Sequence, residues 1–323
     1  MRRLLRKLRS LWPRSHCRIE RHGRVCIAFD PNYPLHVRAY YRYCVELFRN
    51  GFVHADRPVN AIFGAQAARF GNAARTLRID LQLEHTLVRP GGRDSEGATT
   101  GTTPLADDSG CYLVRIANEA YLRSLDTCIE YSRPNLVHVR AAAGFAGLAA
   151  RTALIAPLLY APRFERDGRD IAAISLMFDE RQPRRRHFLD AARRSALPLR
   201  NVRGIFDPDA LRRLYDRVQI LVNVHQTDHH HTFEELRVLP ALLRGVIVVS
   251  EDVPLRDEIP YHRSVVWSRY DSIIDTVRHV LDNLDEYRAR LFAAPLAGVL
   301  AGMARDNRAN VAAAIRRMTA TND

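Results

Sequence analysis

The sequence predicts an α/β protein with two domains, each built on a parallel sheet with helices on both faces. Short apolar segments rich in β-branched residues alternate with amphipathic segments of helical period along most of the 323 residues. A proline-marked stretch ending near residue 162 divides this alternation into two series. Because parallel sheets bind ligands beyond the carboxyl ends of their strands, we expect the site in a cleft between the two domains.

The first series, residues 17–162, forms the first predicted domain. Strands are expected at 24–29, 58–64, 77–88, 126–132 and from 153. Helices are expected at 36–52, at 112–125 and from 133. The polar stretch 89–110 is rich in Gly, Ser and Thr, which predicts a long surface loop.

The second series, residues 163–295, forms the second predicted domain, and 296–323 are expected to form a C-terminal helix. Strands are expected at 171–178, 199–206, 220–226, 246–252 and 264–270. Helices are expected at 181–196, 207–219, 232–245 and from 272. Asp207 followed by Pro208 indicates a helix start, and Gly245 suits a helix carboxyl end.

The composition is that of a globular protein with a strong excess of arginine. The chain has a net charge of +13 with 49 basic residues, of which one, Lys7, is lysine. Either a genomic bias towards arginine or a phosphate-bearing partner explains this excess, because guanidinium groups bind phosphate in a forked geometry. No nucleic-acid-binding module is present, so nucleic acid is not an expected partner. The five scattered cysteines lack metal-ligand spacing and predict reduced thiols in the cytoplasm.

The N-terminal stretch "MRRLLRKLRSLWPR" is basic. Arginines interrupt its apolar residues, so it lacks the continuous apolar run of a secretory signal. Drawn as a helix, residues 1–14 place leucines and a tryptophan together, with basic side chains elsewhere. Such a helix can lie on an anionic membrane surface, and a frayed basic terminus is the alternative. We therefore expect a cytoplasmic protein, with peripheral attachment to an inner membrane as one alternative.

Three stretches of the second half carry a family resemblance: "ISLMFDERQPRRRHFLDAAR", "LRRLYDRVQILVNVHQ" and "TFEELRVLPALLRGVIVVSED". They resemble the nucleotide-sugar domain of bacterial glycosyltransferases with the GT-B fold, in which two Rossmann-like domains face each other across a cleft. "NAIFGAQ", "IDLQLEHT" and "IEYSRPNLVHV" in the first half are weaker matches to the acceptor domain. The resemblance spans most of 58–290, with firm motifs in 171–252.

The resemblance implies transfer of a sugar from a nucleotide-sugar donor to a glycan or lipid-linked acceptor of the cell envelope. It also implies that no metal or other cofactor is required. Many retaining members carry two glutamates eight positions apart around this helix, where the present chain has Thr232 and Pro240. This departure leaves retaining and inverting chemistry both open.

The leaving diphosphate of such a donor needs positive groups, which arginines and helix amino ends supply. The candidate donor-binding residues lie at the expected helix starts and strand ends: Arg184, Arg185, Arg186, Thr232, Arg237, Ser250 and Glu251. The run 184–186 is equally well explained as a solvated helix face. Arg181 is a further phosphate candidate at the same helix start.

The candidate catalytic residues are His225, Glu234, Glu235 and Glu84. Glu235 also completes a Thr232-x-x-Glu235 capping box, which would give it a structural role at the helix start. His225 is expected to line the pocket, as is the loop cluster of His229, His230 and His231; a structural histidine is the other interpretation. Glu84 or His85, at a strand end, would bind the acceptor or act as base, or form a surface pair.

Two alternative functions come from different classes. One is a non-catalytic binding protein with the same fold, specialised by loss of the second glutamate. The other is a metal-dependent hydrolase that uses the cluster 225–231, although these histidines lack paired helical spacing and nearby cysteines. We therefore predict no metal ligands.

Overall fold

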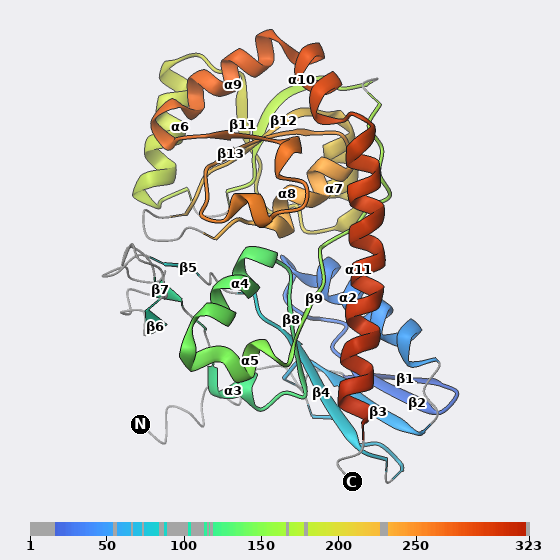
Figure 1. Ribbon diagram of the computed structural model, residues 1–323. Coiled ribbons are helices and arrows are strands. Elements are labelled where there is room, and N and C mark those ends of the chain that lie inside the picture. Colours follow the sequence, from blue (N-terminus) through green and yellow to red (C-terminus); the bar gives the residue numbers. More distant parts are fainter. Residues whose placement is uncertain are drawn as a thin grey trace.

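The computed structural model describes residues 17–53, 57–65, 67–72, 74–83, 87–88, 103–104, 113–114, 116, 119–165, 168–177, 180–226 and 232–320. Two α/β domains lie one above the other, joined by a linker and by the long helix α11 (Ala294–Thr319) (Figure 1). The predicted basic helix of residues 1–14 falls outside the described residues. Within the described part of the chain, no helix combines the length and apolarity needed to cross a bilayer.

The N-terminal domain is built on a six-stranded sheet in the order β1-β2-β3-β4-β8-β9, in which only β1 and β2 pair antiparallel. Its strands are β1 (Arg18–His22), β2 (Val25–Phe29), β3 (Val59–Phe63), β4 (Thr76–Leu81), β8 (Thr127–Glu130) and β9 (Thr152–Leu154). Its helices are α2 (Arg38–Phe52), α3 (Glu119–Arg123), α4 (Arg133–Ala141) and α5 (Ala146–Ala149). The buried face of α2 includes Tyr40, Tyr41, Cys44 and Phe48, as its periodicity predicts.

Three expectations for this domain were wrong. The stretch 112–125, expected to be one helix, contains strand β7 (Leu113–Val114) before α3. The expected strand 77–88 divides into β4 and β5 (Leu87–Val88), and the expected loop 89–110 contains β6 (Thr103–Pro104). β7 pairs with both β5 and β6, and these contacts, distant in sequence, override the local helical pattern.

The C-terminal domain is built on a five-stranded sheet in the order β11-β10-β12-β13-β14, all parallel. Its strands are β10 (Ile171–Ser175), β11 (Leu199–Asn201), β12 (Val218–Asn223), β13 (Ile247–Glu251) and β14 (Val265–Ser268). Its helices are α6 (Pro183–Arg194), α7 (Pro208–Arg217), α8 (Glu235–Leu243), α9 (Ile273–Asp282) and α10 (Leu284–Leu291). β13 is buried throughout, in keeping with its apolar first three residues, Ile247–Val249.

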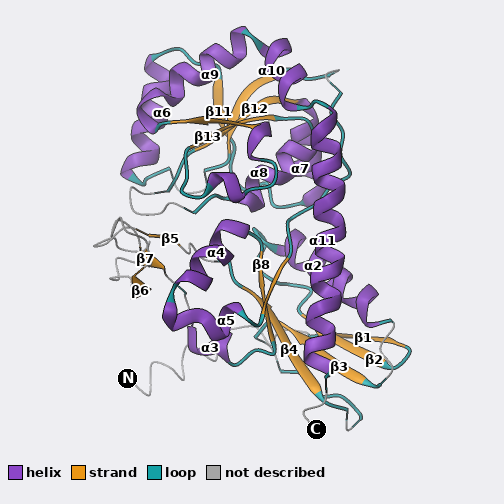
Figure 2. Cartoon of the chain, viewed as in Figure 1, coloured by secondary structure: helices purple, strands orange, loops and turns teal. Residues whose placement is uncertain are grey.

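The two helix-boundary signals of this domain are confirmed. Asp207 precedes α7, and its carboxylate accepts a hydrogen bond from the amide of Ala210 at 2.8 Å. Gly245 follows α8 with a φ of +70°, the left-handed conformation that glycine adopts without strain. The predicted fold class is therefore confirmed: two Rossmann-like α/β domains, seen as separate sheets in Figure 2.

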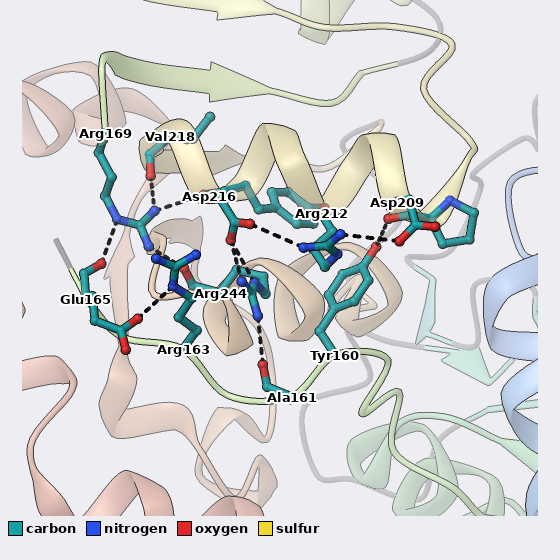
Figure 3. Close-up of polar contacts among 12 residues, drawn as sticks. Tyr160, Ala161, Arg163, Glu165, Arg169, Asp209, Arg212, Asp216, Val218 and Arg244 are labelled. Carbon is teal, nitrogen blue, oxygen red and sulfur yellow. Dashed lines mark hydrogen bonds and ion pairs between the residues drawn. The ribbon is translucent and has the colours of Figure 1, made fainter. Parts of the chain in front are cut away.

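Part of the arginine excess fixes the interdomain linker, residues 155–170, to the C-terminal domain (Figure 3). Arg169 Nη1 donates to the carbonyl oxygen of Tyr215 at 2.8 Å and also to that of Val218, while its Nη2 donates to the carbonyl of Arg244. Burial lowers the pKa of Arg169 to about 10, which leaves it charged at neutral pH. Arg169 thus satisfies carbonyls at the carboxyl ends of α7 and α8.

Two further arginines act in the same way. Arg244 pairs with Asp216 (Nε–Oδ1 2.8 Å) and donates to the linker carbonyl of Ala161 at 3.1 Å. Arg288 donates to the carbonyls of Gly245 and Phe164 at 2.9 and 2.6 Å. These arginines hold backbone carbonyls, so they have a structural role.

Helix α11 belongs to both hydrophobic cores. Leu296, Leu300 and Met303 pack in the core of the C-terminal domain. Val311, Ala314, Ile315 and Met318 pack in that of the N-terminal domain. Between the two groups, α11 runs along the edge strand β9 and its continuation (Figure 1).

Asn307 and Asn310 of α11 bind backbone groups that this edge of the sheet leaves without a neighbouring strand. The carboxamide of Asn307 accepts from the amide of Ala156 at 2.8 Å and donates to its carbonyl at 2.9 Å. Asn310 donates to the carbonyl of Leu154 at 2.9 Å. The side chains of α11 thereby take the place of a further strand.

Candidate functional site

Polar side chains gather where β12 and β13 end. Asn223 ends β12, and Ser250 and Glu251 end β13, in register beside it. All three are buried, and Asn223 Nδ2 donates to Ser250 Oγ at 3.0 Å. The residues just before these ends are apolar, Ile220–Val222 in β12 and Ile247–Val249 in β13. The polar groups therefore gather at the carboxyl edge of the sheet, where α6 and α8 begin.

Arg184, in the first turn of α6, forms a buried two-point ion pair with Glu251. Its Nη1 and Nη2 lie 2.6 and 2.7 Å from the two carboxylate oxygens. The guanidinium also stacks over Tyr270, whose ring centre is 3.8 Å from Cζ, and Tyr270 Oη donates to the Arg184 carbonyl. Glu251 and the Tyr270 ring thus fix the Arg184 guanidinium, and Tyr270 Oη fixes its backbone. The ion pair in turn orients Glu251.

A second charged group joins α6 to α8. Glu234, the residue before α8, pairs with Arg237 and has Arg185 Nη2 at 3.8 Å from its Oε1. Arg237 Nη1 also donates to Asn223 Oδ1 at 3.0 Å. Side chains from two helices and a strand end therefore form one continuous network of hydrogen bonds and charges.

Arg237 keeps donors that this network does not use. Among the described residues, its Nη1 alone makes contacts, so Nε and Nη2 have no partner there. The side chain is 21% exposed, which leaves it accessible to a ligand. A guanidinium fixed at one nitrogen and open at two others is prepared to bind an oxyanion.

His225 lies beside the same network. It is buried, and its backbone amide donates to Glu251 Oε2 at 2.7 Å. Burial lowers the pKa of its imidazole, so the ring is neutral at pH 7. Nε2 lies 3.4 Å from the carbonyl oxygen of Asp252.

The predicted capping box is wrong. Helix α8 begins at Glu235 rather than at 232, and its N-cap is Glu234, whose side chain makes no capping hydrogen bond. The buried Glu235 instead accepts a hydrogen bond from Tyr261 Oη at 2.8 Å. The tertiary partner Tyr261, which is distant in sequence, outweighs the local pairing with Thr232.

The domain junction brings a further acid, Glu130, close to Glu235. Glu130 ends β8 in the N-terminal domain, and its Oε1 accepts from the amides of Tyr131 and Ser132 at 2.9 and 3.0 Å. Its Oε2 is buried without a hydrogen-bond partner among the described residues. The residues predicted from the sequence did not include Glu130, although an acid that directly follows an apolar strand was a usable signal.

Both acids hold their protons more tightly than usual. Burial raises the pKa of Glu130 to about 8, and the nearby Glu235 carboxylate adds to that increase. Burial raises the pKa of Glu235 to about 7, although Ser132 and Tyr261 stabilise its charged form. Two buried carboxyl groups, one from each domain, thus have pKa values near neutral pH.

The remaining predicted residues are placed as follows. Arg186 is exposed on α6, as is Arg181 just before that helix, and Thr232 is buried before α8. Glu84, His85 and the histidines 229–231 lie outside the described residues. Across the described residues, no three His, Cys, Asp or Glu side chains gather as a metal site would require.

The site combines oriented cations with acids that can carry a proton. Arg237 and the amino end of α8 are positive groups that can stabilise negative charge on a ligand. Glu130 and Glu235 supply groups that release or take up a proton near pH 7. This combination suits the transfer or hydrolysis of a group whose leaving part is anionic.

Comparisons with known proteins add little to this geometry. No family model matches the chain. An uncharacterized protein of Acanthamoeba polyphaga mimivirus is 30% identical over 83 residues, which are 24% of this chain and 30% of that protein. A crystal structure of the calicheamicin glycosyltransferase is 13% identical over 90% of this chain and 83% of that one, with a TM-score of 0.34. A TM-score this low carries no argument about function.

Proposed function

We propose that this protein is a glycosyltransferase that moves a sugar from a nucleotide-sugar donor to an acceptor. The observation that carries the proposal is Arg237 beside the strand ends: it is anchored through Nη1, and its Nε and Nη2 have no hydrogen-bond partner in the described part of the chain. Such a group can bind the diphosphate of the donor and stabilise the charge that grows as the sugar leaves. The motifs in 171–252 that resemble GT-B enzymes support the same assignment.

In this proposal the paired carboxylates orient the cations. Glu234 holds Arg237, and Glu251 holds Arg184, so neither guanidinium has to be ordered when the donor binds. Arg186, exposed on α6, is a further phosphate ligand in the proposal. Ser250 and Glu251 shape the floor of the donor site.

Glu130 and Glu235 are the proposed proton-handling pair. Each of these carboxyl groups can keep a proton near neutral pH, because burial disfavours its charged form. The glycosyl acceptor must lose a proton as it attacks, and a deprotonated member of the pair can receive it. Glycan and lipid-linked acceptors of the cell envelope are the acceptor classes that we propose, and the site is proposed to work without a bound metal.

The first experiment is a thermal-shift panel with UDP, GDP, CDP, ADP and TDP, each with and without EDTA. A ligand that binds only the native state raises the unfolding midpoint. We expect one nucleoside diphosphate to raise it regardless of EDTA. No shift with any of the five would contradict donor binding, and a shift that EDTA removes would favour the metal-dependent alternative.

Two arginine variants sharpen the test. Arg237→Ala should weaken binding of the stabilising nucleotide about tenfold or more, because a charge-assisted hydrogen bond contributes about 1.5–3 kcal/mol. Arg194→Ala, at the far end of α6, is the matched control and should leave binding unchanged. Equal affinities of wild type and Arg237→Ala would overturn the role assigned to Arg237.

The non-catalytic binding protein is the alternative that the same variants test. If nucleotide binding needs Arg237 but the purified protein does not hydrolyse or transfer sugar from any cognate nucleotide-sugar, the binding protein is favoured. Turnover that Arg237→Ala removes favours the transferase.

A further inference from the structure

A second pocket lies in the N-terminal domain, lined by residues of α4, α5, β9 and α11 rather than by the strand-end site. Its volume is about 440 Å³, which lies in the range of small-molecule sites. Five alanines line it, and the polar lining consists of Arg140, Thr152, Asn310 and Arg317. The pocket therefore combines an apolar wall with hydrogen-bond donors.

The charged side chains that line this pocket among the described residues are all positive. No carboxylate lines it, and none of Arg140, Arg151 and Arg317 forms an ion pair with a described residue. Arg317 Nη2 donates to Thr127 Oγ1 at 3.2 Å and to the Arg151 carbonyl at 3.1 Å. Burial, and then the charge of Arg151, lower the pKa of Arg317. An anion is the ligand that removes this repulsion.

We propose that this pocket binds a small phosphate ester, with its phosphoryl group at Arg140 and Arg317 and its organic part against the alanines. A phosphoryl group at neutral pH carries up to two negative charges and presents oxygens to several donors, which suits guanidinium groups that converge from two helices. Thr152 Oγ1 donates to the Leu148 carbonyl and can accept from a hydroxyl of the organic part, and Asn310 Nδ2 keeps one N–H beside its bond to the Leu154 carbonyl. The proposal does not depend on the function proposed for the strand-end site.

Binding here would tie α11 to the N-terminal domain. Arg317 and Asn310 belong to α11, whereas Arg140 belongs to α4. A phosphate held between the two helices adds a contact at the end of α11 remote from the C-terminal domain. The site is thus placed to bind a regulatory or second-substrate phosphate outside the domain junction.

The test is calorimetric titration of the full chain with inorganic phosphate, glucose 1-phosphate and ribose 5-phosphate. We expect binding of all three, with the esters at least several-fold tighter because the alanine wall contacts their organic part. Arg140→Ala should weaken binding about tenfold, since Arg140 is exposed and no described residue depends on it. Ala313→Phe should abolish binding by filling the pocket without removing charge.

Two controls separate this pocket from other cationic surfaces. Arg316→Ala removes an exposed arginine from the same helix and should leave affinity within twofold of wild type. Arg186→Ala removes a proposed phosphate ligand of the strand-end site, so it can weaken phosphate binding there. It should leave unchanged the binding that Ala313→Phe abolishes. No heat of binding at millimolar phosphate, wild-type affinity in both Arg140→Ala and Ala313→Phe, or a loss confined to Arg186→Ala would each overturn the proposal.

Discussion

Glu130 shows how one buried oxygen atom without a hydrogen-bond partner among the described residues raises the pKa of a carboxyl group. One oxygen of Glu130 accepts backbone amides at the start of α4, while the other has no partner among the described residues. The charged form of such a group loses its hydration without full replacement, so the proton is retained. A carboxyl group held neutral at pH 7 can donate a hydrogen bond, which an ordinary surface glutamate cannot.

This difference predicts how stability depends on pH. The folded pKa of Glu130, about 8, lies above its ordinary value of 4.5, so folding favours the protonated form. Its contribution to stability is fully present below pH 4.5 and is lost progressively as the pH rises to about 8. Glu130→Gln removes this titration, so its stability relative to wild type should rise by up to about 4 kcal/mol between pH 5 and 9.

Urea denaturation of wild type and Glu130→Gln at pH 5, 7 and 9 measures the effect. Asp282→Asn, on the exposed side of α9, is the control and should track wild type throughout. Parallel stability curves for wild type and Glu130→Gln would show that Glu130 is ionised in the folded protein.

For single residues, the sequence predicted which side chains lie at the strand ends better than it predicted which side chains they contact. Strand ends line the site, which made three positions predictable: Ser250 and Glu251 end β13, and His225 comes two residues after β12. The ion pair of Arg184 with Glu251 and the hydrogen bond from Tyr261 to Glu235 join residues 67 and 26 positions apart. No local pattern encodes these pairings, which is why the capping box was a wrong interpretation.

Among the elements, α8 shows how the end of a helix constrains its surroundings. A Cβ on Gly245 would lie 2.8 Å from the carbonyl oxygen of Arg163 and 2.9 Å from Arg169 Nη2. Gly245 therefore permits both the left-handed turn and the close approach of the arginine-bound linker. The sequence predicted the turn but not the approach, because the linker reaches it only in the folded chain.

Gly245→Ala should lower the free energy of unfolding by about 2 kcal/mol or more, from backbone strain and the steric clash together. Gly298→Ala is the matched control: it lies inside α11, and a methyl group at this position would have no atom within 4 Å. That control should be neutral or stabilise by up to about 1 kcal/mol, since alanine favours a helix. Thermal unfolding of both variants measures the difference, and equal midpoints would contradict the packing described for Gly245.

For the whole molecule, Asn307 is the point where the two domains, the linker and α11 meet. Its carboxamide binds both backbone groups of Ala156 and donates to Tyr43 Oη at 3.0 Å. The alternation of strands and helices in the sequence predicted two domains. The sequence did not predict that one helix would complete both hydrophobic cores, because the helical period of α11 is the same whichever surface it covers.

Asn307→Leu should loosen this junction, because it buries the amide of Ala156 without a partner, at a cost of about 1–3 kcal/mol. The Ala156 carbonyl loses Asn307 but still accepts from the Leu158 amide at 2.9 Å. Hydrogen exchange should become faster at residues 154–158 and in the middle of α11 while the interiors of both sheets stay protected. Arg305→Ala, exposed on the same helix, serves as the control. Unchanged hydrogen exchange at residues 154–158 would show that Asn307 does not hold this segment against α11.

The edge strand that α11 covers also has a consequence for biosynthesis. β9 leaves the ribosome long before its cover, since Asn310 lies 156 residues after the Leu154 carbonyl that it binds. In that interval the nascent N-terminal domain exposes an unprotected strand edge, to which another chain can add. Translation speed across the C-terminal domain, and the chaperones that shield nascent chains, therefore decide how much of the newly made protein escapes aggregation.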